Sequence, residues 1–137
     1  MTVDIGERML VMRKPTHQDA MLFFEYKKWQ QSIGFPEAID FIWNDEFPTG
    51  FDEFTNKIVG TPEERFSMVV AEVMETLGVL YKHDLIAAGL IFDTDTYIPL
   101  WERVEKVVEG MREANDQPEL LENFEALVEA EKAYRAL

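Results

Sequence analysis

The sequence predicts an all-α protein, a single-domain irregular bundle of six to seven helices. Apolar residues recur at three- and four-residue spacing along most of the chain, whereas no segment shows convincingly the two-residue alternation of a paired strand. The prolines and glycines are scattered between these segments and mark short connections. Six or seven helices can therefore pack around one core.

One helical domain is expected over residues 16–137, preceded by an N-terminal extension over residues 1–15. The chain has 137 residues, and a chain of this size removes roughly two thirds of its unfolded surface from water on folding. The apolar cluster over residues 9–12 lies among charged residues and is too short for a signal or membrane segment.

The first helix is expected to begin after Thr16 and to run to about residue 32. The Thr16 hydroxyl can cap it, and Asp19 in its first turn favours the helix dipole. Gly34 is expected to end it. One apolar stripe lies along the helix: Leu22, Phe23, Tyr26, and Trp29 or Gln30.

Two short aromatic elements follow. Pro36 suits the first turn of a second helix, which is expected to run through Trp43. The Phe47-Pro48-Thr49-Gly50 segment should break that helix, and a third element is expected around residues 51–58.

A long central helix has the clearest start in the chain, at Thr61-Pro62-Glu63-Glu64. The threonine hydroxyl can accept an early backbone N–H, and Glu64 can reach back to another. The apolar residues that follow mark a broad buried face: Phe66, Val69, Val70, Val73, Leu77 and Leu80.

A polar corner at Lys82-His83-Asp84 is expected to end the central helix, and a short, nearly all-apolar helix over residues 85–92 should follow it. A helix that is apolar on most sides must be covered on most sides. Burial within the domain is one explanation. The alternative is a homodimer surface formed by Leu85, Ile86, Leu90, Ile91 and Phe92.

The last two helices are amphipathic. Thr94 or Thr96 is expected to cap the first of them, and Pro118 to open the second. The first carries an acidic stripe opposite its apolar side: Glu102, Glu105, Glu109 and Glu113. The second is expected to bury Leu120, Leu121, Phe124, Leu127, Val128 and Tyr134.

The chain is strongly acidic, with 13 Lys and Arg against 27 Asp and Glu and a formal net charge of −14. Such a surface repels phosphate backbones and anionic lipids, so neither nucleic acid nor a membrane is expected as a partner. Solubility explains the charge most simply, and mimicry of nucleic acid by an acidic inhibitor is the alternative. The absence of cysteine suits a cytoplasmic protein.

No motif predicts a catalytic, metal or cofactor site. The only histidines are His17 and His83, neither with metal-ligand spacing, and the HExxH, GxGxxG, Walker and GxSxG motifs are absent. Glu72 and Glu75 are expected on a solvated face. One reserve site remains, in which the helical corner would bring together five residues: Glu72, Glu75, His83, Asp84 and Trp101.

Four features between residues 21 and 134 are shared with one family: the stretch from Gly78 to Ile86, Trp101, Met111-Arg112, and the stretch from Asn123 to Leu127. In these the chain resembles an uncharacterised helical family of bacteria and archaea, known as a domain of unknown function. The resemblance implies an all-helical domain and brings no activity or catalytic residue. Members often carry a membrane-spanning segment ahead of this domain, and none is expected in this sequence.

These features predict a noncatalytic cytoplasmic protein-interaction domain without cofactor or metal. Its expected partner is another protein or a second copy of the chain. The first alternative is a small-molecule or metal-dependent enzyme that uses the reserve site, which requires those side chains to converge in one cleft. The second alternative is the acidic inhibitor.

Overall fold

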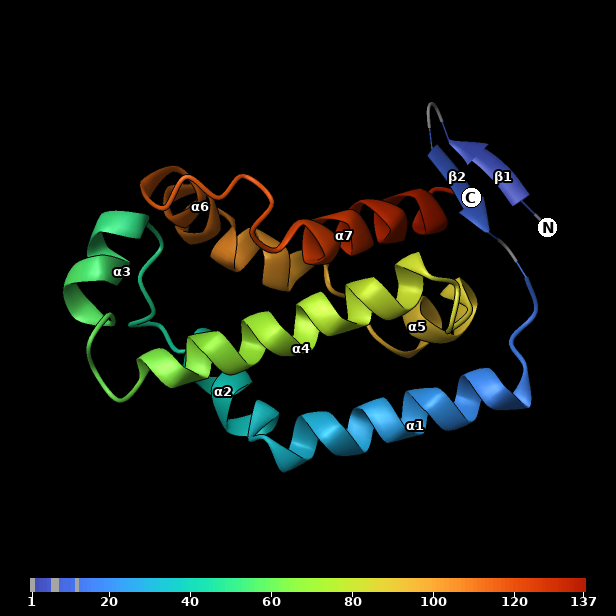
Figure 1. The fold of residues 1–137 in the computed structure, drawn as a ribbon, viewed down its shortest axis with the longest axis horizontal. Helices are drawn as coiled ribbons and strands as arrows, with labels where there is room; N and C mark the ends of the chain where they lie inside the picture. Colours follow the sequence, from blue (N-terminus) through green and yellow to red (C-terminus); the bar gives the residue numbers. More distant parts are fainter. Residues whose placement is uncertain (1, 6–7, 12) are drawn as a thin grey trace.

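The computed structural model describes residues 2–5, 8–11 and 13–137, with side chains described from residue 13 onward. Within this part of the chain, seven helices follow a two-stranded hairpin (Figure 1), and the predicted all-α fold class is confirmed. The elements are β1 (Thr2–Ile5), β2 (Arg8–Val11), α1 (His17–Ser32), α2 (Phe35–Ile42), α3 (Phe51–Lys57), α4 (Glu64–Lys82), α5 (Ala88–Thr94), α6 (Ile98–Ala114) and α7 (Glu122–Arg135).

The N-terminal extension contains a pair of strands that the sequence analysis did not predict. β1 and β2 are antiparallel, with Thr2 opposite Val11 and Ile5 opposite Arg8. The pair lies next to the C-terminal end of α7 (Figure 1). The expectation that no segment forms a paired strand is wrong here, because β1 alternates in polarity over only four residues and β2, with Met9, Leu10 and Val11 in succession, does not alternate.

α1 begins and ends where the sequence predicts. The Asp19 N–H donates to Thr16 Oγ1 at 3.1 Å, and the Thr16 N–H donates to Asp19 Oδ2 at 2.8 Å, which completes a capping box. Gly34 then takes a left-handed conformation with φ +85° and donates its N–H to the Gln31 carbonyl. Pro36 lies in the first turn of α2, as predicted.

The start of α4 matches its prediction in part. Glu64 reaches back as expected, and its Oε2 accepts the Gly60 N–H at 3.0 Å. The Thr61 hydroxyl, however, donates to the Ile58 carbonyl at 2.6 Å instead of accepting an N–H of the helix. Thr61 therefore closes the turn after α3 and does not cap α4.

α4 ends at the predicted polar corner. Asp84 takes a left-handed conformation with φ 55°, and its N–H donates to the Tyr81 carbonyl at 2.9 Å. The Leu85 N–H donates to the Leu80 carbonyl at 3.0 Å, which completes a Schellman motif. Because this turn redirects the chain, residues 85–87 form a connection and α5 begins only at Ala88, three residues later than predicted.

α6 begins at Ile98 and α7 at Glu122, and neither start uses its predicted residues. The Thr94 and Thr96 hydroxyls both donate hydrogen bonds instead of capping α6. Pro118 lies in the turn before α7, not in its first turn. Both helices receive their caps from glutamates of other helices.

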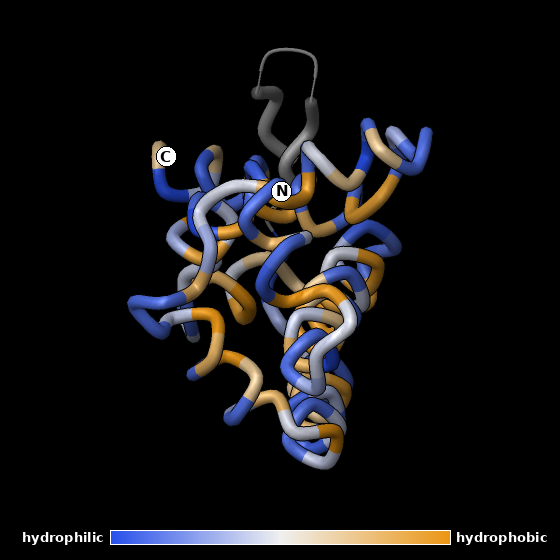
Figure 2. The backbone as a smooth tube through the Cα atoms, turned by 90° about the vertical axis from the view of Figure 1, so that its left-hand side faces the viewer, coloured by the Kyte–Doolittle hydropathy of each residue, from blue (hydrophilic) through white to orange (hydrophobic). Residues whose placement is uncertain are grey.

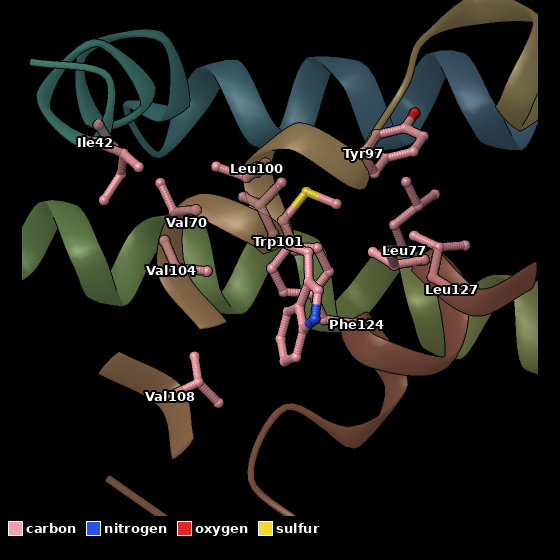
Figure 3. Packing of buried hydrophobic residues seen from close by; sticks show 14 of the residues in the cluster. Ile42, Val70, Leu77, Tyr97, Leu100, Trp101, Val104, Val108, Phe124 and Leu127 are labelled. Atoms are coloured by element: carbon pink, nitrogen blue, oxygen red, sulfur yellow. The ribbon is translucent and has the colours of Figure 1, made fainter. Parts of the chain in front are cut away.

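α4 is the central helix and lies between α1 and α7 in the view of Figure 1. Hydrophilic and hydrophobic residues alternate within single turns of the helices (Figure 2), so each helix has an inner and an outer face. At the centre of the core, the rings of Trp101 and Phe124 pack edge to face with centroids 5.1 Å apart (Figure 3). Leu77 of α4 and Leu127 of α7 lie beside this pair.

Candidate functional site

Glu75, a member of the reserve site, caps α7. Its Oε1 accepts the Phe124 N–H at 2.8 Å, and its Oε2 accepts from Asn123 Nδ2 at 2.9 Å. A carboxylate at a helix N-terminus satisfies N–H groups that have no partner within the helix, and it favours the helix dipole. Glu75 therefore joins α4 to α7. It is half-buried and hydrogen-bonded to α7, whereas a solvated face was predicted.

The other four members of the reserve site occupy separate positions. Glu72 and His83 are exposed, and Asp84 accepts from Arg13 Nε at 2.8 Å. Trp101 is buried, and its indole N–H donates to a glutamate of its own helix. Among the described residues, no hydrogen bond joins any two of the five, and no group of three His, Asp or Glu side chains could hold a metal ion.

The residues predicted as a homodimer surface lie mainly inside the domain. Ile86, Ile91 and Phe92 are buried, and tyrosine rings of α4 and α7 pack on Phe92. Leu90 is half-buried, and only Leu85 is largely exposed. Three of the five side chains are thus already covered by this chain.

A glutamate that the sequence analysis did not single out, Glu131, caps α6. Its carboxylate is fully buried, and its Oε1 accepts the Tyr97 N–H at 2.6 Å and the Ile98 N–H at 3.2 Å. Its Oε2 accepts from the Thr96 hydroxyl and from Arg135 Nε. This carboxylate replaces the predicted threonine cap.

A signal for Glu131 exists in the sequence. It lies four residues after Leu127 and three after Val128, so helical spacing places it on the buried face of α7. A buried charge is costly unless it is paired and hydrogen-bonded. An acidic residue in register with a buried stripe therefore predicts a long-range cap or ion pair, although it does not identify the partner.

An apolar cleft of about 470 Å³ lies between α3, α4 and α6 and continues to the turn before α7. Its walls include Phe51 and Phe54 of α3, Met68 of α4 and Val107 and Met111 of α6. α3 approaches α6 closely at one end, since a Cβ atom on Gly110 would lie 2.2 Å from Phe51 Cβ.

The lining of the apolar cleft suits an uncharged, hydrophobic group. Among the described residues, it contains no Lys, Arg or His and a single carboxylate, Glu64, which accepts the Gly60 N–H. Ser67 Oγ is buried and has no hydrogen-bond partner among the described residues. Volume and chemistry both fall in the range of ligand pockets, which are mostly apolar with few polar groups.

A family model described as domain of unknown function (DUF4760) matches residues 15–130. The chain belongs to this family. The match confirms the resemblance to a helical domain of unknown function. Neither a curated protein nor a solved structure matches the chain significantly.

In this DUF4760 domain the matched residues cover α1 to α6 and the first part of α7, together with the whole lining of the apolar cleft. The hairpin, Arg13 and Glu131 lie outside the match. Within the part of the chain that the structure describes, no helix has both the length and the hydropathy needed to cross a membrane.

Arg13 joins the start of α1 to the end of α4 in the DUF4760 domain. Its guanidinium donates to both carboxylate oxygens of the buried Asp19 and to Oδ1 and the carbonyl of Asp84. The hydrogen bonds from Arg13 are the main cause that lowers the pKa of Asp19 to about 2. The ionised form of Asp19 therefore stabilises the folded state.

We expect this stabilisation to disappear in acid. Because the folded-state pKa of Asp19 lies below its unfolded value, its contribution is complete above about pH 4 and is lost as the pH falls towards 2. Asp19→Asn should cost about 2 kcal/mol at pH 6 and much less at pH 2.5. Urea unfolding of both proteins at the two pH values gives this difference.

The exposed Asp40 offers a matched control, because Asp40→Asn should change stability little at either pH. A cost of Asp19→Asn that stays constant from pH 6 to pH 2.5 would show that the ion pair with Arg13 contributes no pH-dependent stability.

Proposed function

We propose that the chain is a noncatalytic cytoplasmic protein-interaction domain, and that the apolar cleft between α3, α4 and α6 holds hydrophobic side chains of a partner protein. The observation that carries the proposal is the cleft itself, about 470 Å³ of space with an almost wholly apolar lining. Open apolar surface of this kind is rare in a monomer unless it serves binding.

The rim of the cleft supports a protein partner. Met68 is 65% exposed and Val59 is 47% exposed, and both residues line the cleft. Methionine is flexible and polarisable, so it adapts to differently shaped apolar side chains. An occupant that enters the cleft would also cover these two side chains.

The charge of the chain supports a basic partner. The net charge is −14, and none of the described side chains that line the cleft is basic. Complementary charge accelerates association and excludes acidic competitors. We therefore expect the partner to carry hydrophobic residues that enter the cleft, flanked by Lys or Arg.

Self-association through residues 85–92 is the less favoured form of this proposal. Ile86, Ile91 and Phe92 lie in the core, so a second copy would find mainly Leu85 and part of Leu90. A hydrophobic interface normally has a larger apolar centre. The partner surface is therefore placed at the cleft.

A synthetic amphipathic peptide of leucine and lysine tests the cleft. With the methionine methyl groups labelled with ¹³C, we expect the peptide to shift the NMR signals of Met68 and Met111, which line the cleft. The signal of Met21, which is exposed on α1, should stay in place. Replacing lysine by glutamate in the peptide should weaken binding at least tenfold, roughly the effect of like charges at an interface.

A pair of Ala→Leu variants locates the binding. Ala71 lines the cleft, so Ala71→Leu should fill part of it and weaken the binding of the leucine–lysine peptide about tenfold or more. Ala136→Leu adds the same side chain at an exposed position outside the cleft and should leave the affinity unchanged. Equal affinities of both variants, or binding that leaves Met68 and Met111 unshifted, would exclude the cleft as the peptide site.

A further inference from the structure

A second cavity, of about 260 Å³, lies between α1, α2 and the start of α6. It is separate from the apolar cleft, since the two share no lining residue. We call it the tyrosine cavity. The lining residues that matter here are Tyr26, Lys27, Trp43, Met74, Asp95 and Tyr97.

The Tyr97 hydroxyl is the unusual feature of the tyrosine cavity. Tyr97 is only 6% exposed, and its buried hydroxyl has no hydrogen-bond partner among the residues that the structure describes. The oxygen points towards α1 and away from the Trp101–Phe124 pair (Figure 3). Buried polar groups without partners are unfavourable and rare, so a hydrogen-bond acceptor for the Tyr97 hydroxyl is expected.

The neighbouring Tyr26 does not accept a hydrogen bond from the Tyr97 hydroxyl. Tyr26 also lines the cavity, but its hydroxyl donates to the Val73 carbonyl at 3.0 Å. Burial raises the pKa of Tyr26 and of Tyr97, so both hydroxyls stay protonated at neutral pH. Among the described residues that line the cavity, Tyr97 therefore carries a buried O–H group without a hydrogen-bond partner.

The remaining walls favour an uncharged molecule with an apolar body. Lys27 and Asp95 contribute opposite charges, and Trp43, Met74 and Leu100 contribute apolar surface. Gln30 and Thr96 add polar groups to these walls, so water can occupy the cavity when no ligand is bound. The volume suits a single ring with aromatic neighbours on its faces.

We propose that the tyrosine cavity binds a small uncharged ring compound whose carbonyl or ether oxygen accepts a hydrogen bond from Tyr97. This site is independent of the partner surface proposed above, because it lies among other residues. Specificity would come from the hydroxyl, since a buried donor without its acceptor disfavours a pure hydrocarbon.

Cyclohexanone and methylenecyclohexane are suitable probes, because they share a ring and differ in the acceptor. Titration of cyclohexanone is expected to shift the ¹³C-methyl signal of Met74, which lines this cavity, and to leave Met68 and Met111 in place. Tyr97→Phe should weaken the binding of cyclohexanone about fivefold, which is the effect of one net hydrogen bond. The affinity for methylenecyclohexane should stay unchanged. The variant should unfold at the same or a higher temperature, because no hydrogen bond among the described residues is lost.

Tyr134→Phe serves as the control, because the Tyr134 hydroxyl donates to Asp93 outside the cavity. This variant should bind cyclohexanone as the unmodified chain does. Two results would overturn the proposal. Equal weakening of both probes by Tyr97→Phe would show that the hydroxyl does not recognise the oxygen, and a Met74 signal that neither probe moves would show that the cavity holds water only.

Discussion

Replacing Glu131 by alanine is expected to lower the free energy of unfolding by about 4 kcal/mol. The substitution removes the acceptor of the Tyr97 and Ile98 N–H groups and of the Thr96 hydroxyl. Hydrogen bonds to a charged group contribute about 1.5–3 kcal/mol each, and donors left without partners in a buried site cost more than the bond alone. The start of α6 would lose its cap and gain a cavity.

Arg135 extends this effect to α5. It pairs with Glu131 and also donates to the carbonyls of Phe92 and Asp95 at the end of α5. Without Glu131, the guanidinium loses the carboxylate that orients it. One buried carboxylate therefore supports the end of α5, the start of α6 and the C-terminal part of α7 together.

Urea unfolding of Glu131→Ala and Glu131→Gln separates charge from shape. Glutamine retains an acceptor for the two N–H groups, but its NH₂ group faces the Thr96 and Arg135 donors, so a loss of about 2 kcal/mol is expected. Glu129→Ala is the control, because the Glu129 ion pair with Lys132 is exposed and should contribute less than about 0.5 kcal/mol. Similar midpoints for Glu129→Ala and Glu131→Ala would contradict the buried cap.

The helix ends show how far the sequence could predict this fold. α1 was predicted well because its capping groups, Thr16 and Asp19, lie in the segment that they cap. The predicted starts of α6 and α7 were wrong because the residues that cap these helices, Glu131 and Glu75, lie more than thirty residues away in the sequence. Local patterns identify the caps that a helix supplies itself, whereas a cap from another helix depends on how the helices pack.

The cavities could not be predicted from the sequence, for a related reason. Aromatic residues at helical spacing face inward whether the space between helices is filled or not. Trp101 lies in the core, Trp43 lines the tyrosine cavity, and no tryptophan lines the apolar cleft. The residues of the reserve site do not converge, because Glu75 accepts a hydrogen bond from Asn123 and Asp84 accepts one from Arg13. No spacing rule distinguishes these outcomes.

Gly78→Ala is the second large effect, with an expected loss of about 3 kcal/mol in the free energy of unfolding. A Cβ atom on Gly78 would lie 2.2 Å from the Asn123 carbonyl oxygen and 2.5 Å from its carbon. These are backbone atoms and cannot rotate away, so α7 must move from α4. The gain in helix propensity from glycine to alanine, about 1 kcal/mol, offsets only part of this cost.

The displacement would also strain the cap of α7, because Glu75 holds Asn123 and the Phe124 N–H one turn before Gly78. Since Leu121 and Phe124 line the apolar cleft, the variant should bind the leucine–lysine peptide more weakly as well. Gly89→Ala is the matched control. Its Cβ would meet the Tyr134 hydroxyl at 3.7 Å and Asp93 Oδ2 at 4.0 Å, both ordinary contacts, so stability should stay equal or rise by up to about 1 kcal/mol. Equal urea midpoints for both variants would show that α7 can shift without loss, and that neither its close contact with α4 nor the Glu75 cap positions the wall of the cleft.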